Sequence, residues 1–210
     1  MRTSSTSYAS LCAACGRRRP SVEREVMLTG IGGQGVQLAA QVLARAATLE
    51  GRNAMFFGVY GGTMRGGNTD STIVVSDGEI AAPPIISRTW SAIVMHPQFW
   101  EPLRGKLRPG AVVLLNSTLF EGELERESYR VFDLPASQRA AELGNPLTAS
   151  MWMTGAYAGI TGLVGLEAAI EAMQASLPPY RRQHIEANAT ALRAGFEAIE
   201  GQSAPAWTEG

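Results

Sequence analysis

A glycine-rich turn near the start of the chain has the composition of an anion-binding loop. Residues 30–35 read GIGGQG, with an apolar run before them and a helical repeat of apolar residues after them. Glycines at 30, 32 and 35 permit a tight turn and let backbone N–H groups approach a ligand. The dipole of the following helix favours negative charge at that point. The turn is therefore a candidate binding site for a phosphate or a carboxylate.

Two other interpretations of this turn stay open from the local sequence. In a dinucleotide-binding domain for NAD or FAD, a carboxylate that binds ribose ends the second strand, about 20 residues further on. Here the second expected strand continues into Gly58, Val59 and Tyr60, and Glu50 precedes it, so dinucleotide binding is disfavoured. Alternatively, the glycines only pack the strand against the helix and bind no ligand.

A second segment places one arginine among four glycines. Residues 60–68 read YGGTMRGGN, with Arg65 between two pairs of glycines. The guanidinium of arginine is a permanent cation whose planar fork fits a carboxylate or a phosphate. The segment follows the second expected strand, at the sheet edge where ligands bind in parallel α/β folds. A surface salt bridge on a loop is the alternative role for Arg65.

The elements that would position these segments alternate regularly from residue 24 onward. Short apolar runs predict six strands, and apolar repeats at helical spacing predict helices. Continuously apolar strands separated by helices indicate a mostly parallel sheet that is covered on both faces. We predict an α/β fold, namely a Rossmann-like doubly wound sheet with helices on both faces and two C-terminal helices. The expected strands are 25–29, 54–57, 71–75, 91–95, 111–115 and 130–134, and the expected helices are 36–49, 99–107, 147–174 and one after Pro178-Pro179.

Length and charge limit the classes of function. The 210 residues fit one domain, which we place at 24–201, with a disordered extension at 1–22 and a tail at 202–210. A formal net charge of −1 argues against nucleic acid or an anionic membrane surface as the main partner. Residues 143–166 contain no charge, but their several glycines and polar residues favour a buried helix over a membrane span.

Few side chains are of the kinds that bind metal, and we predict no metal site in this chain. Cys12 and Cys15 are the only cysteines, and zinc or iron–sulfur sites usually need four ligands. His96 follows the fourth expected strand, where a general base is one possible role, but we expect it to satisfy a backbone group at a helix start. His184 lies early in the last helix and is expected to face solvent. Asn116 closes the fifth strand, where it could bind a ligand or cap the next segment.

The two glycine-rich segments together resemble one protein family. GIGGQG after the first strand, followed by YGGTMRGGNTDSTIVVSDGEI and a proline pair at 83–84, is similar to the gamma subunit of 2-oxoacid:ferredoxin (acceptor) oxidoreductases. A glycine-rich helix around 155–165, then Asn188 and Gly195-Phe196, extend the resemblance over about residues 25–200. Residues 61–64 (GGTM) depart from the sequence that many members carry before their Arg-Gly-Gly, which leaves the 2-oxoacid open.

The resemblance implies a subunit of a cytoplasmic enzyme, inactive alone. Such complexes oxidatively decarboxylate a 2-oxoacid with coenzyme A (CoA), which gives acyl-CoA, carbon dioxide and reduced ferredoxin or another electron acceptor. Alpha and beta partner subunits, or their fused equivalents, would hold thiamine diphosphate, magnesium and iron–sulfur clusters. CoA would be the co-substrate, and this chain alone would bind no cofactor firmly. Members that use pyruvate, 2-oxoglutarate, branched-chain or aryl 2-oxoacids all fit.

The same resemblance implies that the two glycine-rich segments line one anion-facing edge. The anion would be a phosphate of CoA, the carboxylate of the substrate or a carboxylate of a partner, and no catalytic residue is assigned. A free-standing nucleotide-binding Rossmann-like enzyme and a purely structural assembly subunit remain the alternatives. The candidate binding residues are Gly30, Gly32, Gly33, Gln34, Gly35, Arg65, Gly66, Gly67 and Asn68.

Overall fold

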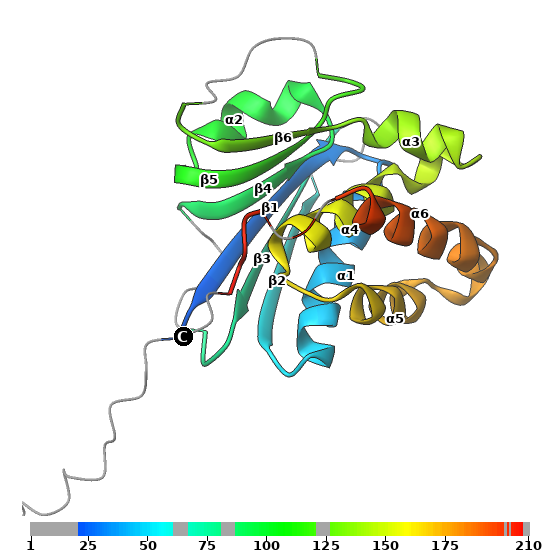
Figure 1. Ribbon diagram of the computed structural model, residues 1–210, viewed down its shortest axis with the longest axis horizontal. Coiled ribbons are helices and arrows are strands. Elements are labelled where there is room, and N and C mark those ends of the chain that lie inside the picture. The colour runs from blue at the N-terminus through cyan, green and yellow to red at the C-terminus, as the bar shows by residue number, and fades with distance from the viewer. Residues whose placement is uncertain are drawn as a thin grey trace, which may run out of the picture.

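Six strands form one sheet through the middle of the molecule (Figure 1). The structure is a computed structural model that describes residues 21–60, 67–80, 87–120, 127–199, 201 and 203–207, except for the side chains of residues 59 and 60. Arg65, Gly66, Cys12 and Cys15 lie outside the described residues, as does all of the expected N-terminal extension before residue 21.

The sheet has the strand order β2-β3-β1-β4-β5-β6. β1, β4, β5 and β6 pair in parallel, whereas β3 is antiparallel to both β1 and β2. β2 therefore runs in the same direction as β1, and only β3 is reversed among these six strands. The predicted α/β fold with a mostly parallel sheet is confirmed. The strands are β1 (Glu23–Ile31), β2 (Asn53–Tyr60), β3 (Asn68–Ser76), β4 (Thr89–Val94), β5 (Leu107–Asn116) and β6 (Arg130–Leu134).

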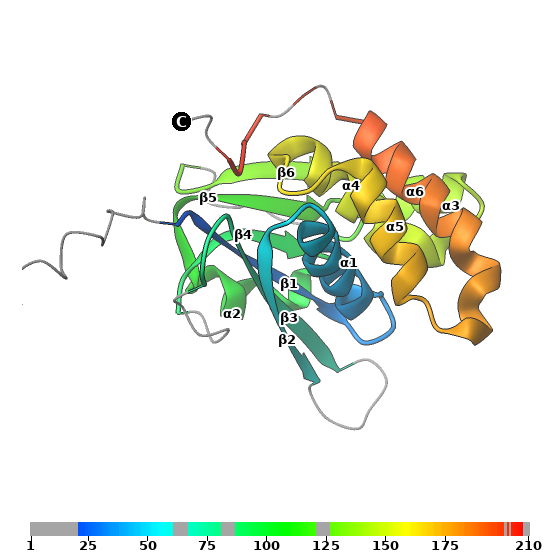
Figure 2. The ribbon, with the colours of Figure 1, turned by 90° about the horizontal axis from the view of Figure 1, so that it is seen from below.

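Helices cover both faces of the sheet, but unequally (Figure 2). On one face α1, α4, α5 and α6 enclose the larger core, which includes Val26 and Leu28 of β1. On the other face α2 packs Trp100 and Leu103 over Met27 and its neighbours. The helices are α1 (Val36–Leu49), α2 (Trp100–Arg104), α3 (Ala136–Glu142), α4 (Ala149–Thr161), α5 (Leu166–Ser176) and α6 (Ile185–Glu197), and the 3-10 turns are η2 (Pro97–Phe99), η3 (Pro146–Thr148) and η4 (Pro179–His184).

The expectation of two C-terminal helices is wrong, because the helix expected over 147–174 is two helices. α4 ends at Gly162, which adopts the left-handed conformation at φ 56° that favours glycine. The chain then turns, and α5 starts after Gly165, whose N–H donates to Glu50 Oε1 at 2.6 Å. In the described part of the chain, three α-helices therefore follow residue 148, namely α4, α5 and α6.

Two further differences concern short helices. The helix expected over 99–107 is wrong in extent, because α2 ends at Arg104 and Leu107 already belongs to β5. The N–H of Thr89 in β4 donates to the Lys106 carbonyl at 2.7 Å, so this part of the chain is held at the start of the sheet rather than in a helix. α3 was not expected, since seven residues are too few to show a clear apolar repeat.

The uncharged helix α4 is the centre of the helical layer. All thirteen of its residues are buried, and it crosses α6 at two glycines. A Cβ atom at Gly155 would lie 2.0 Å from the Leu192 carbonyl oxygen, and one at Gly195 would lie 1.9 Å from that of Trp152. Backbone thus meets backbone at this crossing, as expected for a buried helix. Across the described parts of the chain, every helix is too short or too polar to cross a membrane.

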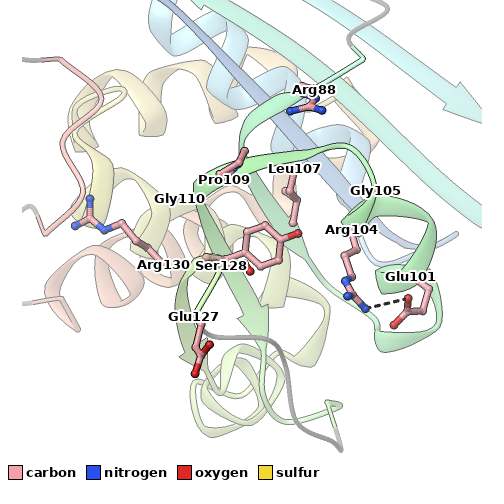
Figure 3. Close-up of a pocket in the computed structure, with 11 residues that line it drawn as sticks. Arg88, Glu101, Arg104, Gly105, Leu107, Pro109, Gly110, Glu127, Ser128 and Arg130 are labelled. Carbon is pink, nitrogen blue, oxygen red and sulfur yellow. Dashed lines mark ion pairs between the residues drawn. The ribbon is translucent and has the colours of Figure 1, made fainter.

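An open cavity of about 1050 Å³ lies where β5 and β6 begin, beside the end of α2 (Figure 3). Arg88, Arg104 and Arg130 line it together with two carboxylates. Arg104 pairs with Glu101 at 3.7 Å. Arg130 donates to the carbonyl of Ser203, so one wall of the cavity is fastened to the C-terminal part of the chain.

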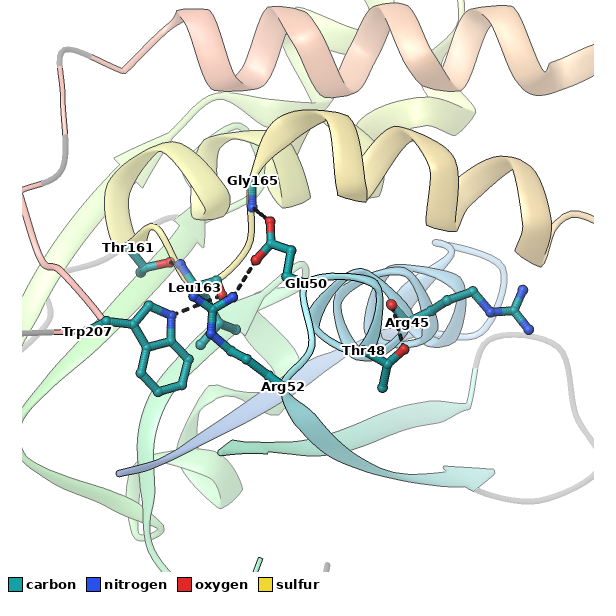
Figure 4. Close-up of polar contacts among 8 residues, drawn as sticks. All are labelled: Arg45, Thr48, Glu50, Arg52, Thr161, Leu163, Gly165 and Trp207. Atoms are coloured by element: carbon teal, nitrogen blue, oxygen red, sulfur yellow. Dashed lines mark hydrogen bonds and ion pairs between the residues drawn. The ribbon is translucent and has the colours of Figure 1, made fainter. Parts of the chain in front are cut away.

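Residues 203–207, which lie in the expected tail, pack against the helical layer and are called the C-terminal strap here. The N–H groups of Ala204 and Ala206 donate to the carbonyls of Ile160 and Thr161 at 3.0 and 2.7 Å. Both alanines are buried, since their small side chains fit beneath the strap. Trp207 donates from its indole N–H to the Leu163 carbonyl at 3.2 Å (Figure 4).

Candidate functional site

The predicted glycine-rich turn joins β1 to α1 at the carboxyl edge of the sheet. Its own groups close the turn: the N–H of Gln34 donates to the Ile31 carbonyl at 3.0 Å, and the Gln34 side chain accepts from the Ile31 N–H at 2.8 Å. Gly33 and Gly35 have φ of 105° and 79°, a region that other residues rarely adopt. The sequence pattern therefore identified a turn that requires glycine at both positions.

The end of the second glycine-rich segment is bonded directly to this turn. The N–H of Gly32 donates to the carbonyl of Gly67 at 2.9 Å, and Asn68 lies opposite Ile31 in the β1–β3 ladder. The antiparallel direction of β3 makes this possible, because its first residues begin where β1 ends. The structure thus brings together the described candidates of both segments, while the segment's Arg65 lies outside the described residues.

Polar side chains on β1 and β3 form a small cluster beneath the turn. Asp70 accepts from Thr29 Oγ1 at 2.7 Å and from Asn68 Nδ2 at 2.9 Å. Both carboxylate oxygens of Asp70 are therefore engaged, and Asn68 is held by its amide nitrogen. Sequence reasoning assigned no role to Asp70, because its partner Thr29 is forty-one residues away and only the strand register pairs them.

The N-terminus of α1 carries free donors at the same edge. Within the described residues, the N–H groups of Gly33 and Gly35 donate no hydrogen bond, and Gly33 is exposed with open space where a Cβ would be. The first turn of α1 contains no acidic residue, and Gly35 offers no side-chain cap. An anion placed here would meet N–H groups and the positive end of a fourteen-residue helix.

A second helix also reaches this edge through Ser150. A Cβ atom added to Gly35 would lie 2.5 Å from Ser150 Oγ, so the serine side chain lies directly against the turn. Ser150 is buried near the start of α4, more than one hundred residues along the chain from Gly35. No local sequence signal indicated it, because its position depends on how α4 packs over α1.

The topology places these groups where ligands bind in open α/β sheets. β1 leads to α1 on one face, whereas its parallel neighbour β4 leads to α2 on the other face. The chain therefore diverges between the carboxyl ends of β1 and β4, and such a switch point forms a crevice in this fold class. The glycine-rich turn lies on the β1 side of this switch point.

Two other residues at this edge have structural roles. His96 Nδ1 accepts from the Gln98 N–H at 3.3 Å, so it caps the turn η2 as expected. Asn116 Oδ1 accepts from the Ser137 N–H at 3.1 Å, and its Nδ2 donates to Ser137 Oγ at 2.7 Å. Of the two roles open to Asn116, the structure therefore supports capping of α3. His184 is exposed, as expected.

The large cavity of Figure 3 lies at the opposite edge of the sheet, where β5 and β6 begin. It shares no residue with the glycine-rich turn or with the start of β3. Its arginines are balanced in part by Glu101 and Glu127. The glycine-rich edge stays the predicted anion site, because its donors are backbone amides at a helix N-terminus.

Comparison with known sequences gives consistent matches over nearly the whole described fold. The sequence profile of the family described as pyruvate ferredoxin/flavodoxin oxidoreductase matches residues 25–198. The chain is 35% identical over 184 residues to the 2-oxoglutarate synthase subunit KorC of Methanothermobacter thermautotrophicus, which covers 85% of this chain and 96% of that protein. It is 28% identical to the pyruvate synthase subunit PorC of the same species, over 84% of this chain and 96% of that protein.

Solved structures with the same fold agree with the sequence matches. The gamma subunit of a keto/oxoacid ferredoxin oxidoreductase from Geobacter sulfurreducens superposes with a TM-score of 0.72 at 28% identity, over 83% of this chain and 95% of that chain. A 2-oxoglutarate:ferredoxin oxidoreductase from Magnetococcus marinus superposes with a TM-score of 0.75 at 17% identity, over 85% of this chain and 32% of that chain. At that identity the second match shows the fold alone.

Proposed function

Because the chain belongs to the pyruvate ferredoxin/flavodoxin oxidoreductase family and is a gamma subunit of a 2-oxoacid:ferredoxin oxidoreductase complex, we propose that its glycine-rich edge binds a phosphate group of CoA in the assembled enzyme. The chain would then contribute to the binding and orientation of the co-substrate. The bond-making steps would belong to the partner subunits.

One observation carries this proposal, namely the junction of the two glycine-rich segments at the N-terminus of α1. The 2.9 Å bond between Gly32 N and Gly67 O brings the segments together, and the amides of Gly33 and Gly35 donate to no group among the described residues. Backbone N–H groups and a helix dipole suit a phosphate, which accepts several hydrogen bonds and carries negative charge. Arg65 precedes Gly67 by two residues in the sequence, and its guanidinium would supply a cation to the same ligand.

The cofactors of the reaction fit the partner subunits better than this edge. Thiamine diphosphate would supply the carbanion-stabilising chemistry, and iron–sulfur clusters would take up the electrons. Clusters need thiolate ligands, whereas the donors at the glycine-rich edge are backbone amides, a hydroxyl and the carboxamide of Asn68. This set of donors fits an anionic co-substrate. We place the complex in the cytoplasm, as fractionation of host cells would test.

The proposed 2-oxoacid is 2-oxoglutarate. Three relatives at 30–35% identity are 2-oxoglutarate synthase subunits, and each is matched over at least 96% of its length. Pyruvate and ketoisovalerate subunits match at 28–32% identity. A panel of 2-oxoacids offered to the purified complex would test the choice, and the proposal requires the highest kcat/KM for 2-oxoglutarate.

The Gly33→Ala variant tests the binding role in the complete complex. Alanine rarely adopts the positive φ of residue 33, so the turn would shift and move an amide away from the phosphate. The KM for CoA should therefore rise about tenfold, the effect of one lost charge-assisted hydrogen bond. The KM for the 2-oxoacid should stay unchanged. Arg65→Ala should likewise weaken the binding of CoA or lower kcat.

Gly110→Ala is the matched control for that experiment. Gly110 is also exposed, has φ of 75° and has no atom within 4 Å of an added Cβ, but it lies at the opposite edge of the sheet. Both variants therefore carry similar backbone strain, and only Gly33→Ala should alter CoA kinetics. Equal CoA constants in both variants, with a lower yield of complex, would instead support a purely structural subunit.

A further inference from the structure

The hydroxyl of Ser150 is the exception among the hydroxyl groups of its helix. Thr148, Thr154 and Thr161 each donate to a backbone carbonyl within 2.8 Å. Ser150 Oγ makes no hydrogen bond within the described residues, although Ser150 is only 3% exposed. A hydroxyl on a nearly buried residue that has no protein partner gains a hydrogen bond when a ligand or water reaches it.

The direction of this hydroxyl is fixed by its contact with the turn. It lies against the backbone of Gly35, at 2.5 Å from where a Cβ would be, so only a glycine at position 35 leaves room for it. Gly35 is the N-cap residue of α1 and precedes the first free helical amides. The Ser150 side chain therefore points from α4 into the space at the N-terminus of α1.

We propose that Ser150 Oγ donates a hydrogen bond to the phosphate that the N-terminus of α1 binds, an inference that rests on the proposed function. The amides of Gly33 and Gly35 approach from the turn, and the hydroxyl approaches from a different helix. Donors from separate directions match the tetrahedral oxygens of a phosphate better than the planar pair of a carboxylate. Ser150 is thus a binding residue that fixes the orientation of CoA between α1 and α4.

Ser150→Ala in the complete complex is the test, read by calorimetric titration with CoA in the absence of 2-oxoacid. The dissociation constant should rise about fivefold to tenfold, the effect of one hydrogen bond to a charged group. The KM for the 2-oxoacid should stay unchanged. The melting temperature of the complex should not fall, because the lost hydroxyl makes no hydrogen bond in the described part of the chain.

Thr154→Val is the matched control on the same helix. It removes one buried hydroxyl whose bond goes to the Ser150 carbonyl at 2.7 Å, and it keeps the side-chain volume. We expect this variant to melt earlier than the wild type and to bind CoA normally. Weakened CoA binding in Thr154→Val by the same factor as in Ser150→Ala would overturn the proposal, because a general disturbance of α4 would then explain both.

Titration with 3′-dephospho-CoA identifies which phosphate is bound. If Ser150 contacts the diphosphate, Ser150→Ala raises the dissociation constants of CoA and of 3′-dephospho-CoA by the same factor. If Ser150 contacts the 3′-phosphate, the substitution raises the dissociation constant of CoA only. Unchanged CoA affinity in Ser150→Ala contradicts the inference, and a raised CoA KM in Gly33→Ala would then leave the proposed function standing. If Ser150→Ala leaves the CoA affinity unchanged and Gly33→Ala leaves the KM for CoA unchanged, both the inference and the proposed function are contradicted.

Discussion

At the scale of single residues, the binding candidates differ in how visible they are in the sequence. Gly33 and Gly35 could be predicted because a turn with left-handed residues has a glycine pattern of its own. Asp70 and Ser150 could not be predicted, since each acquires its neighbour from a distant part of the chain. Local sequence patterns therefore predict residues that a particular backbone conformation requires. They do not predict residues that reach the site only through tertiary packing.

Tyr157 gives a residue-scale prediction for alkaline pH. Complete burial raises the pKa of its phenol, which hydrogen-bonds to Ser91 Oγ at 2.8 Å. An unfolded tyrosine loses its proton near pH 10, so above that pH the unfolded chain is deprotonated first and the native chain stays protonated. The free energy of unfolding should therefore fall as the pH rises through about 10. Urea titrations at several alkaline pH values measure this slope.

Variants of two tyrosines identify the source of that slope. Tyr157→Phe should flatten the alkaline slope and cost about 1 kcal/mol at neutral pH, because its hydrogen bond to Ser91 is lost. Tyr180→Phe is the control, since Tyr180 is 72% exposed. The interpretation fails if the slope survives in Tyr157→Phe or disappears in Tyr180→Phe.

At the scale of elements, apolar periodicity predicted the six strands and the helix α1 well, but it predicted the ends of other helices poorly. The helix at 36–49 and the strand at 130–134 agree with the structure at both ends. The reversed direction of β3 was not predicted, because a buried apolar strand has the same composition in either direction. The break between α4 and α5 depends on the left-handed φ of Gly162 and on a contact with distant Glu50, neither of which periodicity reports.

The crossing of α4 and α6 gives the element-scale prediction. Gly195→Ala would place a methyl carbon about 1.9 Å from the Trp152 carbonyl oxygen, so the helices would have to separate. Forced overpacking of this kind costs about 1–3 kcal/mol, and we expect a matching decrease in the urea-unfolding free energy of the chain. Gly105→Ala is the control, because that glycine has φ of −62° and open space around it. Equal stability of the two variants would contradict the close crossing.

At the scale of the whole molecule, the C-terminal strap connects the sheet with the helical layer. Arg24 of β1 donates to the Ala206 carbonyl at 2.6 Å, and Arg130 of β6 holds Ser203. Arg52, which directly precedes β2, lies 4.7 Å from the centre of the Trp207 ring and pairs with Glu50 (Figure 4). Arginines from three parts of the chain thus hold five residues that sequence composition alone suggested to be a tail.

Trp207 gives the whole-molecule prediction. Trp207→Ala removes the ring under Arg52 and the bond to the Leu163 carbonyl, and we expect a loss of about 2–3 kcal/mol, below the range for a fully buried tryptophan. Trp207→Phe keeps an aromatic face and loses only the N–H donor, so its cost should be near 1 kcal/mol. Thermal unfolding of the two variants separates these contributions. Identical melting of Trp207→Ala and the wild type would show that the strap does not support the fold.

The glycine crossing described above also bears on how this fold tolerates sequence divergence. Where α4 and α6 meet at Gly155 and Gly195, their separation depends on no side-chain volume. Side chains elsewhere along both helices can change over evolutionary time without sliding one helix along the other. Ser150 lies five residues before Gly155 on the same helix. The contact that fixes the position of α4 therefore also fixes the position of Ser150 beside the glycine-rich turn. We expect lineages of the family to lose the apolar side chains around the crossing long before they lose its two glycines.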